Sequence, residues 1–219
     1  MQIIIGNKNY SSWSLRPWLL LKHFGVPFEE VVIPLFTEGF EEKIAKYSPT
    51  RRVPVLRDGA STLWDSLAIC EYIAEKYLKG QALPLDIEER GLCRSYCSEM
   101  HSGFFAIRSE MPMNCRARKS LQISAAANAE CERVDQLFSE ARARFGHRGE
   151  YLFGDFSLAD CMFAPIVMRF LTYGIGVSQS SQNYIDFMLM NPALRAWVEA
   201  ARKERQILPD YELGEEVSP

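Results

Sequence analysis

The feature that most constrains the fold is a change of pattern at Lys79–Pro84. Ahead of this stretch, short apolar runs alternate with segments of helical periodicity. Beyond it no run predicts a strand, and helical periodicity dominates. We therefore predict a small mixed sheet with helices over residues 1–79, a linker over 80–85 and an all-helical part over 86–219.

The first part predicts a β-α-β unit, a connection and then a β-β-α unit. A right-handed crossover between the first two strands would give a small sheet covered by helices. An Asp-Gly pair at Asp58-Gly59 indicates the hairpin between the last two strands. The expected elements are a strand at 3–5, a helix ending at Gly25, a strand at 28–33, strands at 55–56 and 61–64, and a helix from Asp65-Ser66.

The second part predicts long helices separated by glycine and proline. Ser157, with Asp160 three residues later, matches a capping box, in which each side chain binds the backbone N–H at the other position. We expect the apolar helix that follows to be buried at the centre of this part. The other expected features are a helix from Ile87 to Met111, one from Ser120 to Phe145, one from Pro192, and a frayed tail over 212–219.

Composition narrows the class of partner. The chain has 219 residues, 47% of them apolar, and a formal net charge of −3. This balance gives no electrostatic reason to expect nucleic acid or a membrane surface as a partner. No segment approaches the roughly 20 apolar residues that cross a bilayer, and the N-terminus lacks the pattern of a signal peptide. We expect a soluble cytoplasmic protein.

The cysteines and histidines give no metal-binding pattern. None of the six cysteines forms a Cys-x-x-Cys pair, and the three histidines are scattered. We expect no metal site and free, mostly buried thiols, as in a reducing compartment. The cysteines are Cys70, Cys93, Cys97, Cys115, Cys131 and Cys161.

A turn with three serines precedes the first expected helix. Ser11, Ser12 and Ser14 stand where unpaired backbone N–H groups and the positive end of the helix dipole favour an anion. Serines at such a place are first of all helix caps. The composition of the turn alone leaves capping and chemistry both open.

Four motifs in the same order and spacing resemble those of the cytosolic glutathione transferases. Ser11–Arg16 is similar to the Ser-Ser-Cys-x-x-Arg segment of zeta-like members, and Arg52–Leu56 resembles the Val-Pro-x-Leu element with its cis proline. Asp65–Ile69 resembles the element at the start of the third helix. Gly154–Asp160 resembles the capping box of the helical domain. The resemblance implies a thioredoxin-like N-terminal domain followed by an all-helical C-terminal domain.

The resemblance also implies a catalytic residue. The thiol of glutathione must become a thiolate before it attacks an electrophile, and a free thiol has a pKa of about 8.5. Counted back from Arg16, the matching serine is Ser11, whose hydroxyl would donate a hydrogen bond to the thiolate. Tyr10 is the alternative donor, Ser12 stays undecided, and Ser14 is expected to be the helix cap.

Glutathione would bind along three of the motifs. The resemblance implies that the Val53 backbone pairs with the cysteinyl backbone, as an added strand does, and that a cis Pro54 presents it outward. Asp65 and Ser66 would hold the γ-glutamyl end, and Arg52, or else Arg51, the glycyl carboxylate. The implied glutathione-binding set is Ser11, Ser12, Arg52, Val53, Pro54, Asp65 and Ser66.

One departure concerns the reaction. Trp13 stands where zeta members have a cysteine, and the second part shows no match to the residues of their maleylacetoacetate isomerases. We expect the variable electrophile pocket along the first long helix of the second part. The candidates for electrophile binding are Trp13, His101, Phe105 and Arg108.

The sequence thus predicts a glutathione transferase that conjugates glutathione to small hydrophobic electrophiles. Glutathione would be a co-substrate, with no permanently bound cofactor, and the protein would be a homodimer, as the family usually is. Two alternatives stay open: a glutathione-dependent cis–trans isomerase of the maleylacetoacetate type, and a non-catalytic binding module with the same fold. Thiol–disulfide exchange is disfavoured because no cysteine stands near Ser11.

Overall fold

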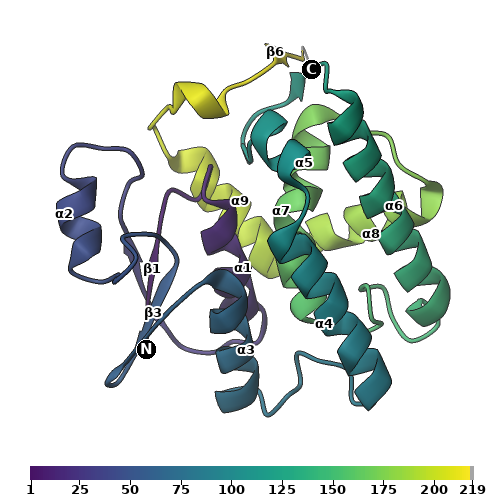
Figure 1. Ribbon diagram of the computed structural model, residues 1–219, viewed down its shortest axis with the longest axis horizontal. Coiled ribbons are helices and arrows are strands. Elements are labelled where there is room, and N and C mark those ends of the chain that lie inside the picture. Colours follow the sequence, from purple (N-terminus) through teal and green to yellow (C-terminus); the bar gives the residue numbers. More distant parts are fainter. Residues whose placement is uncertain (218–219) are drawn as a thin grey trace.

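A computed structural model describes residues 1–217 of the chain (Figure 1). Its main sheet has the strand order β2-β1-β3-β4. β1 is parallel to β2, while β3 is antiparallel to both β1 and β4, so that Ile4 lies between Val31 and Val55. The strands are β1 (Gln2–Ile5), β2 (Glu29–Val32), β3 (Val55–Asp58) and β4 (Ser61–Trp64).

Helices cover both faces of this sheet. Ile3, Ile5 and Leu56 point to the face that packs against α1 (Ser12–His23) and α3 (Ser66–Lys76). Ile4 and Val55, one residue out of phase, form a separate buried cluster with Ile44 of α2 (Phe40–Ala45). The alternation of side chains along a strand explains this division, and Figure 1 shows α2 alone on its side of the sheet.

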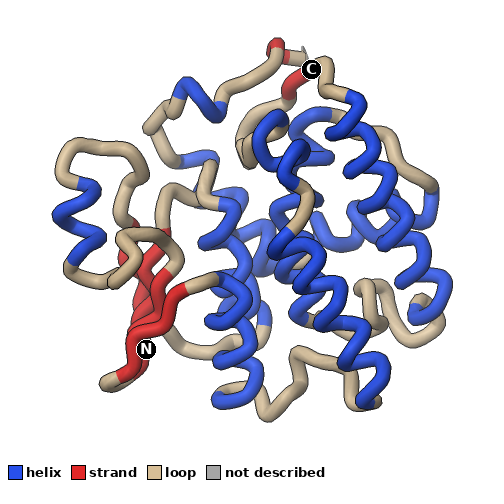
Figure 2. The backbone as a smooth tube through the Cα atoms, viewed as in Figure 1, coloured by secondary structure: helices blue, strands red, loops and turns tan. Residues whose placement is uncertain are grey.

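The remainder of the described chain is mostly helical (Figure 2). Its strands are two short ones, β5 (Lys119–Ser120) and β6 (Glu215–Glu216), which pair with each other. The helices are α4 (Ile87–Ser102), α5 (Phe105–Glu110), α6 (Ala125–Phe145), α7 (Leu158–Tyr173), α8 (Gln179–Met190), α9 (Pro192–Lys203) and the single turn η1 (Pro209–Tyr211). The predicted fold class is confirmed: a small sheet with helices, followed by a helical half.

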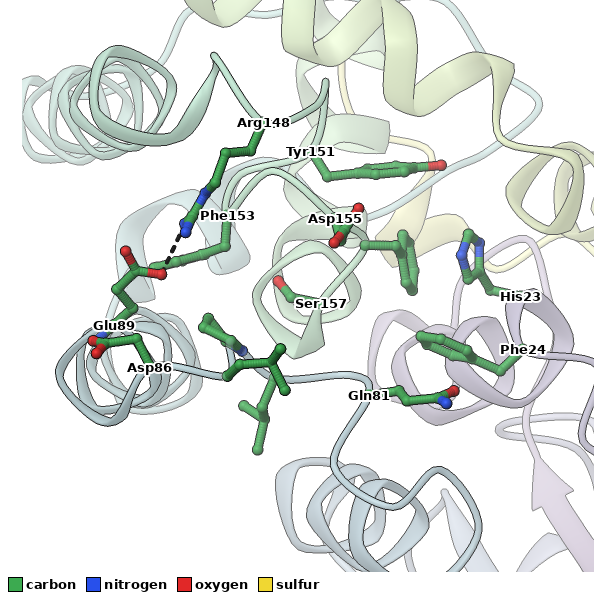
Figure 3. Close-up of a pocket in the computed structure, with 14 residues that line it drawn as sticks. His23, Phe24, Gln81, Asp86, Glu89, Arg148, Tyr151, Phe153, Asp155 and Ser157 are labelled. Carbon is green, nitrogen blue, oxygen red and sulfur yellow. Dashed lines mark hydrogen bonds and ion pairs between the residues drawn. The ribbon is translucent and has the colours of Figure 1, made fainter.

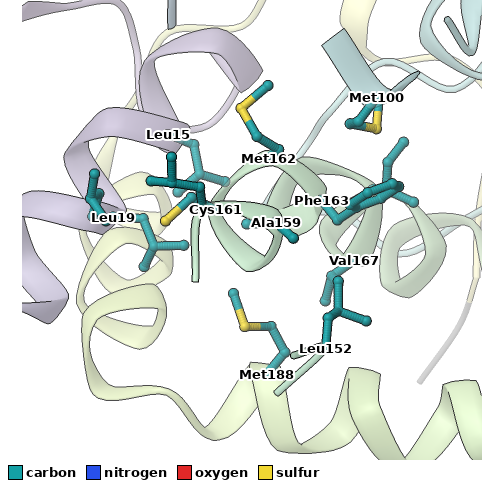
Figure 4. Packing of buried hydrophobic residues seen from close by; sticks show 14 of the residues in the cluster. Leu15, Leu19, Met100, Leu152, Ala159, Cys161, Met162, Phe163, Val167 and Met188 are labelled. Carbon is teal, nitrogen blue, oxygen red and sulfur yellow. The ribbon is translucent and has the colours of Figure 1, made fainter. Parts of the chain in front are cut away.

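Helix α7 lies at the centre of the core and is buried along almost its whole length. It packs against α1 of the first part and α4 of the second, and Figure 4 shows Leu15 and Leu19 of α1 beside Cys161 and Met162. The predicted capping box is present. The backbone N–H and the hydroxyl of Ser157 both donate to the carboxylate of Asp160, at 2.8 Å each.

Two helix predictions were wrong, one because the helix is interrupted and one because it begins later in the chain. The helix expected over 87–111 is two helices, because Phe104 adopts a left-handed conformation (φ 58°) after Gly103 and the axis changes there. The helix expected from Ser120 begins instead after Ser124, whose hydroxyl caps it. Helix α8 was not predicted, since its first turns are polar and carry no clear apolar stripe.

The tail that we expected to be frayed is in contact with the first part. The Tyr10 hydroxyl donates to Oε1 of Glu212 (2.6 Å), and β6 continues the chain beyond it. Just ahead, the Glu204 carboxylate accepts the backbone N–H groups of Lys8 (2.7 Å) and Asn9 (3.0 Å). The last two residues of the expected tail, 218–219, lie outside the described residues. Within residues 1–217, no helix has the length and hydropathy to cross a membrane.

Candidate functional site

The serine turn joins β1 to α1. Ser11 occupies the N-cap position by its backbone, but its side chain does not cap the helix. Its buried hydroxyl instead donates to Oγ of Ser14 at 2.7 Å, and Ser14 also accepts the Gly6 N–H at 3.2 Å. The expectation that Ser14 caps the helix is therefore wrong, because Ser14 lies in the first turn and holds the loop to the helix.

The Ser14 hydroxyl is the acceptor in both of its described hydrogen bonds, so its own proton can still be donated. If the Ser11 proton turns toward a thiolate, the Ser14 hydroxyl can reverse its bond and donate to Ser11. Ser12, the first residue of α1, is half-buried and also lines the cavity beside the turn.

The hydroxyl of Tyr10 is already engaged. Only 2% of this residue is exposed; its O–H donates to Glu212 and accepts from Nη2 of Arg116, each at 2.6 Å. Burial and the hydrogen bond to Glu212 raise the pKa of Tyr10. These contacts argue against Tyr10 as the thiolate donor, although its ring lines the same cavity.

Two adjoining cavities open next to the turn. One, here called the serine cavity, has a volume of about 620 Å³ and contains Ser11 and Ser12; the other, the proline cavity, has about 550 Å³ and contains Pro54 and Ser66. They adjoin each other, because both are lined by Trp13, Thr50, Arg52 and Val53.

The proline cavity brings together the second and third motifs. The Val53–Pro54 peptide bond is cis, and Val53 lies just ahead of β3, outside the paired registers of the sheet. Across the cavity, Oδ1 of Asp65 caps α3 by accepting the N–H groups of Leu67 and Ala68, at 2.9 and 3.2 Å. Ser66, the first residue of α3, is buried.

A buried cation lies beneath both cavities. Arg16 donates to Oγ of Ser66 (3.3 Å) and to the carbonyl of Met162 (3.2 Å), and its guanidinium lies 4.3 Å from the Trp13 ring centre. Burial, with a smaller effect of Arg169, lowers the pKa of Arg16 to about 9, so it is charged at neutral pH. This charge favours an anion next to the serine turn.

His101 reaches the proline cavity from the second part of the chain. Its Nε2 lies 3.0 Å from Oδ2 of Asp65, and its ring meets the Trp13 ring edge-on at 5.4 Å. Its Nδ1 is buried and has no hydrogen-bond partner among the described residues. Burial is the main cause that lowers the pKa of His101. We expected it on the electrophile side, but it lies beside Asp65.

The structure separates the other electrophile candidates. Trp13 lines both cavities and Arg108 lines the serine cavity. Phe105 lines neither: it is 66% exposed, and its ring packs on the Arg108 guanidinium at 4.8 Å. The change of axis at Phe104 removes it from the helix face on which the spacing had placed it, and its role in electrophile binding stays a prediction.

Sequence reasoning missed Arg169, Thr50, Pro112 and Tyr211, which also line the serine cavity. Arg169 had a signal: it is the one arginine in the apolar helix α7, and a charge inside a buried helix needs a reason. Pro112 and Tyr211 had none, because they reach the cavity from parts of the chain distant in sequence from the motifs, and Thr50 stands just ahead of the Arg52–Leu56 motif without being part of it.

A larger cavity of about 800 Å³ lies elsewhere, between α1 and the segment ahead of α7 (Figure 3). Phe156 stacks on His23 there, with ring centres 3.7 Å apart, and Glu89 pairs with Arg148 at 2.8 Å. It contains none of the serines of the turn. Among residues 1–217, no group of three or more His, Cys, Asp or Glu side chains could hold a metal ion.

Comparison with known families gives two matches along the chain. The family model described as glutathione S-transferase, N-terminal domain, matches residues 10–76. The model described as glutathione S-transferase, C-terminal domain, matches residues 124–200. The two matches include the serine turn, the Val53–Pro54 and Asp65–Ser66 elements, and α7.

Individual relatives are similar over most of their length. Glutathione S-transferase 1 of Dianthus caryophyllus is 29% identical over 183 residues, which are 82% of this chain and 81% of the relative. A maleylpyruvate isomerase of Ralstonia is 29% identical over 170 residues, covering 73% and 80%. A maleylacetoacetate isomerase of Rattus norvegicus is 28% identical, covering 76% of each chain.

Solved structures of glutathione transferases are also similar to this chain. A glutathione transferase homologue of Burkholderia, solved with bound glutathione, has a TM-score of 0.70 and 27% identity, covering 93% of this chain and 98% of that chain. A maleyl pyruvate isomerase described as a bacterial zeta-class glutathione S-transferase also has a TM-score of 0.70; at 24% identity it shows the same fold.

Proposed function

Since this chain belongs to the cytosolic glutathione S-transferase family, we propose that it is a glutathione transferase whose thiolate donor is Ser11. The observation that carries the assignment of the site is that the two cavities adjoin and share four lining residues. Together they gather the serine turn, the Val53–Pro54 element and the Asp65–Ser66 helix start from three distant segments.

Glutathione would lie across the proline cavity. The unpaired backbone of Val53 offers the cysteinyl residue a strand-like partner. The start of α3 and the Asp65 carboxylate suit the carboxylate and the ammonium of the γ-glutamyl end, respectively. Arg52, exposed on the rim of both cavities, suits the glycyl carboxylate better than Arg51, which lies 4.0 Å from Glu41.

The thiol would then point to the serine cavity. At pH 7 a thiol with a pKa of about 8.5 is only a few per cent ionised, so stabilising the thiolate raises the rate directly. The Ser11 hydroxyl, backed by Ser14, would donate to the sulfur. The first turn of α1 and the buried Arg16 add positive potential. The thiolate then attacks an electrophile in the serine cavity.

A glutathione-dependent cis–trans isomerase is the second candidate. The maleylpyruvate and maleylacetoacetate isomerases of similar identity favour it, since they are matched as well as the transferase relatives. Trp13, in place of the cysteine of the zeta motif, separates this chain from that pattern. A non-catalytic binding module is the third reading, which any glutathione-dependent turnover excludes.

The test combines glutathione affinity with turnover. We expect the protein to bind a glutathione column and to conjugate 1-chloro-2,4-dinitrobenzene. Ser11→Ala is expected to lower kcat by about 100-fold, as removal of one donor to a developing anion does, with little change in the KM for glutathione. The kinetic pKa of the bound thiol is expected to rise toward 8.5 in the pH profile.

Ser12→Ala is the matched control, because it removes a neighbouring hydroxyl from the same cavity. It is expected to keep most of kcat. If Ser12→Ala instead loses the rate while Ser11→Ala keeps it, the thiolate donor is Ser12. Failure of the wild type to bind glutathione removes the proposal as a whole.

Three further expectations remain proposals. We propose that the glutathione-binding domain is residues 1–79, the linker 80–85 and the domain with the electrophile pocket 86–219. We propose a homodimer, which sedimentation equilibrium would show as twice the chain mass. We propose a cytoplasmic location, which fractionation of the cells that make the protein would test.

A further inference from the structure

A cavity of about 800 Å³ lies apart from the proposed transferase site, between the end of α1, residues 81–89 and residues 148–157 (Figure 3). It is here called the aromatic cavity. It shares no lining residue with the serine cavity or the proline cavity. Its volume is within the range of cavities that bury a small organic ligand. A ligand can therefore occupy it while glutathione is bound.

Aromatic rings form one wall of the aromatic cavity. Phe156 stacks on His23, with ring centres 3.7 Å apart. The rings of Tyr151 and Phe24 meet the same Phe156 ring edge-on, at 5.1 and 6.0 Å. On the rim, 90% of Leu85 is exposed, so its apolar surface is left uncovered. Because the face of an aromatic ring is electronegative, such a wall attracts a cation as well as an apolar group.

His23 adds no charge to this wall at neutral pH. Oδ1 of Asn191 accepts the N–H groups of Ala193 and Leu194, at 2.9 and 3.3 Å. The amide nitrogen of Asn191 therefore faces Nδ1 of His23, at 3.0 Å, so that Nδ1 accepts and the ring carries its proton on Nε2. Burial lowers the pKa of His23 below its usual 6.5. The imidazole is thus a neutral ring within the aromatic wall.

The acidic side chains of this cavity outnumber the basic ones. Those that line it are Asp86, Glu89 and Asp155, against the one arginine Arg148. Oδ1 of Asp86 caps α4 by accepting the N–H groups of Glu88 and Glu89, at 3.0 Å each, and its Oδ2 has no partner among residues 1–217. Asp155 is exposed and forms no ion pair among the same residues. Two carboxylates at the cavity therefore lack a cation.

Two arginines near the cavity are bound to other groups. Arg148 donates to Oε2 of Glu89 at 2.8 Å. Arg90 does not line the cavity: it donates to the carbonyls of Pro84 (2.9 Å) and Leu85 (3.0 Å). Neither arginine pairs with the two open carboxylates.

We propose that the aromatic cavity binds an organic cation that carries aromatic rings. The positive charge lies toward Asp86 and Asp155, and the rings pack on the wall formed by Phe156 and Phe24. An organic anion is disfavoured, because both open carboxylates repel it and the arginine of the lining is already paired. This ligand is distinct from glutathione and from the electrophile, so the inference goes beyond the proposed transferase reaction.

The test measures the affinities of tetraphenylphosphonium and tetraphenylborate by isothermal titration calorimetry. The two ions have nearly the same shape and size and opposite charges. Tetraphenylphosphonium is expected to bind with a Kd of about 10 µM, an ordinary value for a ligand of about 25 non-hydrogen atoms. Tetraphenylborate is expected to bind at least about 10-fold more weakly, because the reversed sign turns two attractions into two repulsions. Saturating S-methylglutathione is expected to leave both affinities unchanged.

Removal of the two charges is expected to remove the preference for the cation. In the double variant Asp86→Asn with Asp155→Asn, the affinity for tetraphenylphosphonium should fall about 10-fold, to within about threefold of that for tetraphenylborate. Asparagine at position 86 still caps α4, so the variant keeps its fold. Asp186→Asn, at an exposed carboxylate of α8 outside the cavity, is the matched control and should keep the full preference.

A second variant tests the aromatic wall. Phe24→Leu keeps an apolar side chain at the end of α1 but removes the ring. It is expected to weaken the binding of tetraphenylphosphonium about threefold, the usual contribution of a partly exposed cation–π contact. Unchanged binding of the cation by Phe24→Leu would contradict the proposed seat of its rings.

The outcomes of the titrations decide the proposal. Equal affinities of the wild type for the two ions overturn it, and so does a preference that survives in the double variant. Displacement of tetraphenylphosphonium by S-methylglutathione also overturns it, because the cation would then lie in the serine cavity or the proline cavity. The proposed transferase activity does not depend on any of these results, since its own test is glutathione binding and turnover.

Discussion

The imidazole of His101 connects the second part of the chain to the proposed glutathione site. Its Nε2 contacts Oδ2 of Asp65 at 3.0 Å, while Oδ1 of the same carboxylate caps α3. A neutral imidazole that donates from Nε2 fixes the carboxylate without cancelling its charge. Asp65 therefore stays available to a ligand ammonium as long as His101 is neutral.

This contact predicts a dependence of binding on pH. Burial lowers the pKa of His101 below its usual 6.5. Below that pKa the ring gains a positive charge and competes with the γ-glutamyl ammonium for Asp65. The affinity for S-methylglutathione, which has no thiol to titrate, is expected to fall about fivefold as the pH drops through this range. Isothermal titration calorimetry at several pH values measures it.

His101→Gln keeps a donor to Asp65 and cannot titrate, so its affinity is expected to stay flat with pH. His147→Gln, at an exposed position, should behave as the wild type.

The effect of pH on folding stability has the same sign as its effect on affinity. Because the unfolded chain takes up its proton near pH 6.5 and the folded chain only lower, folding stability is lost as the pH falls below 6.5. A difference in the free energy of unfolding between the wild type and His101→Gln that does not change with pH would contradict this prediction.

The side chains that stand inside local motifs were the ones that sequence could place. Ser11, Val53 and Asp65 each belong to a short pattern with its own conformational reason, and the structure brings all three to two adjoining cavities. Local pattern did not show that Ser14 would bond to Gly6 or that Tyr10 would meet Glu212. Those partners are set by how distant segments pack.

At the scale of elements, α7 depends on one carboxylate. Asp160 is fully buried and accepts from four donors: the N–H groups of Leu152 (3.1 Å) and Ser157 (2.8 Å), the Ser157 hydroxyl (2.8 Å) and the Tyr184 hydroxyl (3.1 Å). Asp160 thus joins the loop ahead of α7 and helix α8 to the first turn of α7.

Asp160→Asn is expected to lower the free energy of unfolding by about 3 kcal/mol, because an amide nitrogen facing buried donors leaves them unpaired. Urea titration followed by fluorescence measures the change. Turnover per folded molecule should not change, since Asp160 lines neither cavity. Asp155→Asn, at an exposed carboxylate of the same loop, is the matched control. A loss under 1 kcal/mol for Asp160→Asn would refute the role.

The boundary between α4 and α5 shows why the ends of elements were harder to predict. Periodicity runs on from Ile87 to Met111, and Gly103 alone does not require a break. The left-handed φ of 58° at Phe104 is sustained by its burial, only 5% of the residue being exposed, which is a tertiary effect. The capping signal at Ser157–Asp160 is local, and it was predicted correctly.

At the scale of the whole molecule, the segment after α9 returns across the first part. Gln206 accepts from the Asn7 side chain (2.7 Å) and donates to the Leu35 carbonyl (2.8 Å). Tyr211 meets the Tyr10 ring edge-on at 5.4 Å and lines the serine cavity. The proline cavity contains no residue of this segment. The segment therefore belongs to one cavity and not to the other.

Removal of residues 206–219 is expected to separate the two substrates. The KM for the electrophile should rise about tenfold, as Tyr211 and the cover of Tyr10 are lost, while the KM for glutathione stays the same. The melting temperature should drop by several degrees, since a loss of a few kcal/mol lowers it by that much. A chain shortened by the last two residues only is the control. An equal rise of both KM values would contradict the division between the cavities.

Composition and pattern were sufficient for the architecture of the whole chain, because the change from mixed to helical periodicity is carried by many residues at once. They were insufficient for the returning segment. Its acidic residues have no amphipathic pattern, and their partners, Tyr10 and Lys119, lie about a hundred or more residues away. Such pairings depend on a surface that exists only after the rest has folded.

The contacts of Glu204 with Lys8 and Asn9 have a consequence for synthesis. The loop that leads into the serine turn leaves the ribosome 196 residues ahead of the carboxylate that pairs its backbone N–H groups. Helices α1 and α3 can form on the sheet while translation continues, but this loop stays without those two bonds. A nascent chain therefore completes the hydrogen bonds of this loop only after α9 has been made.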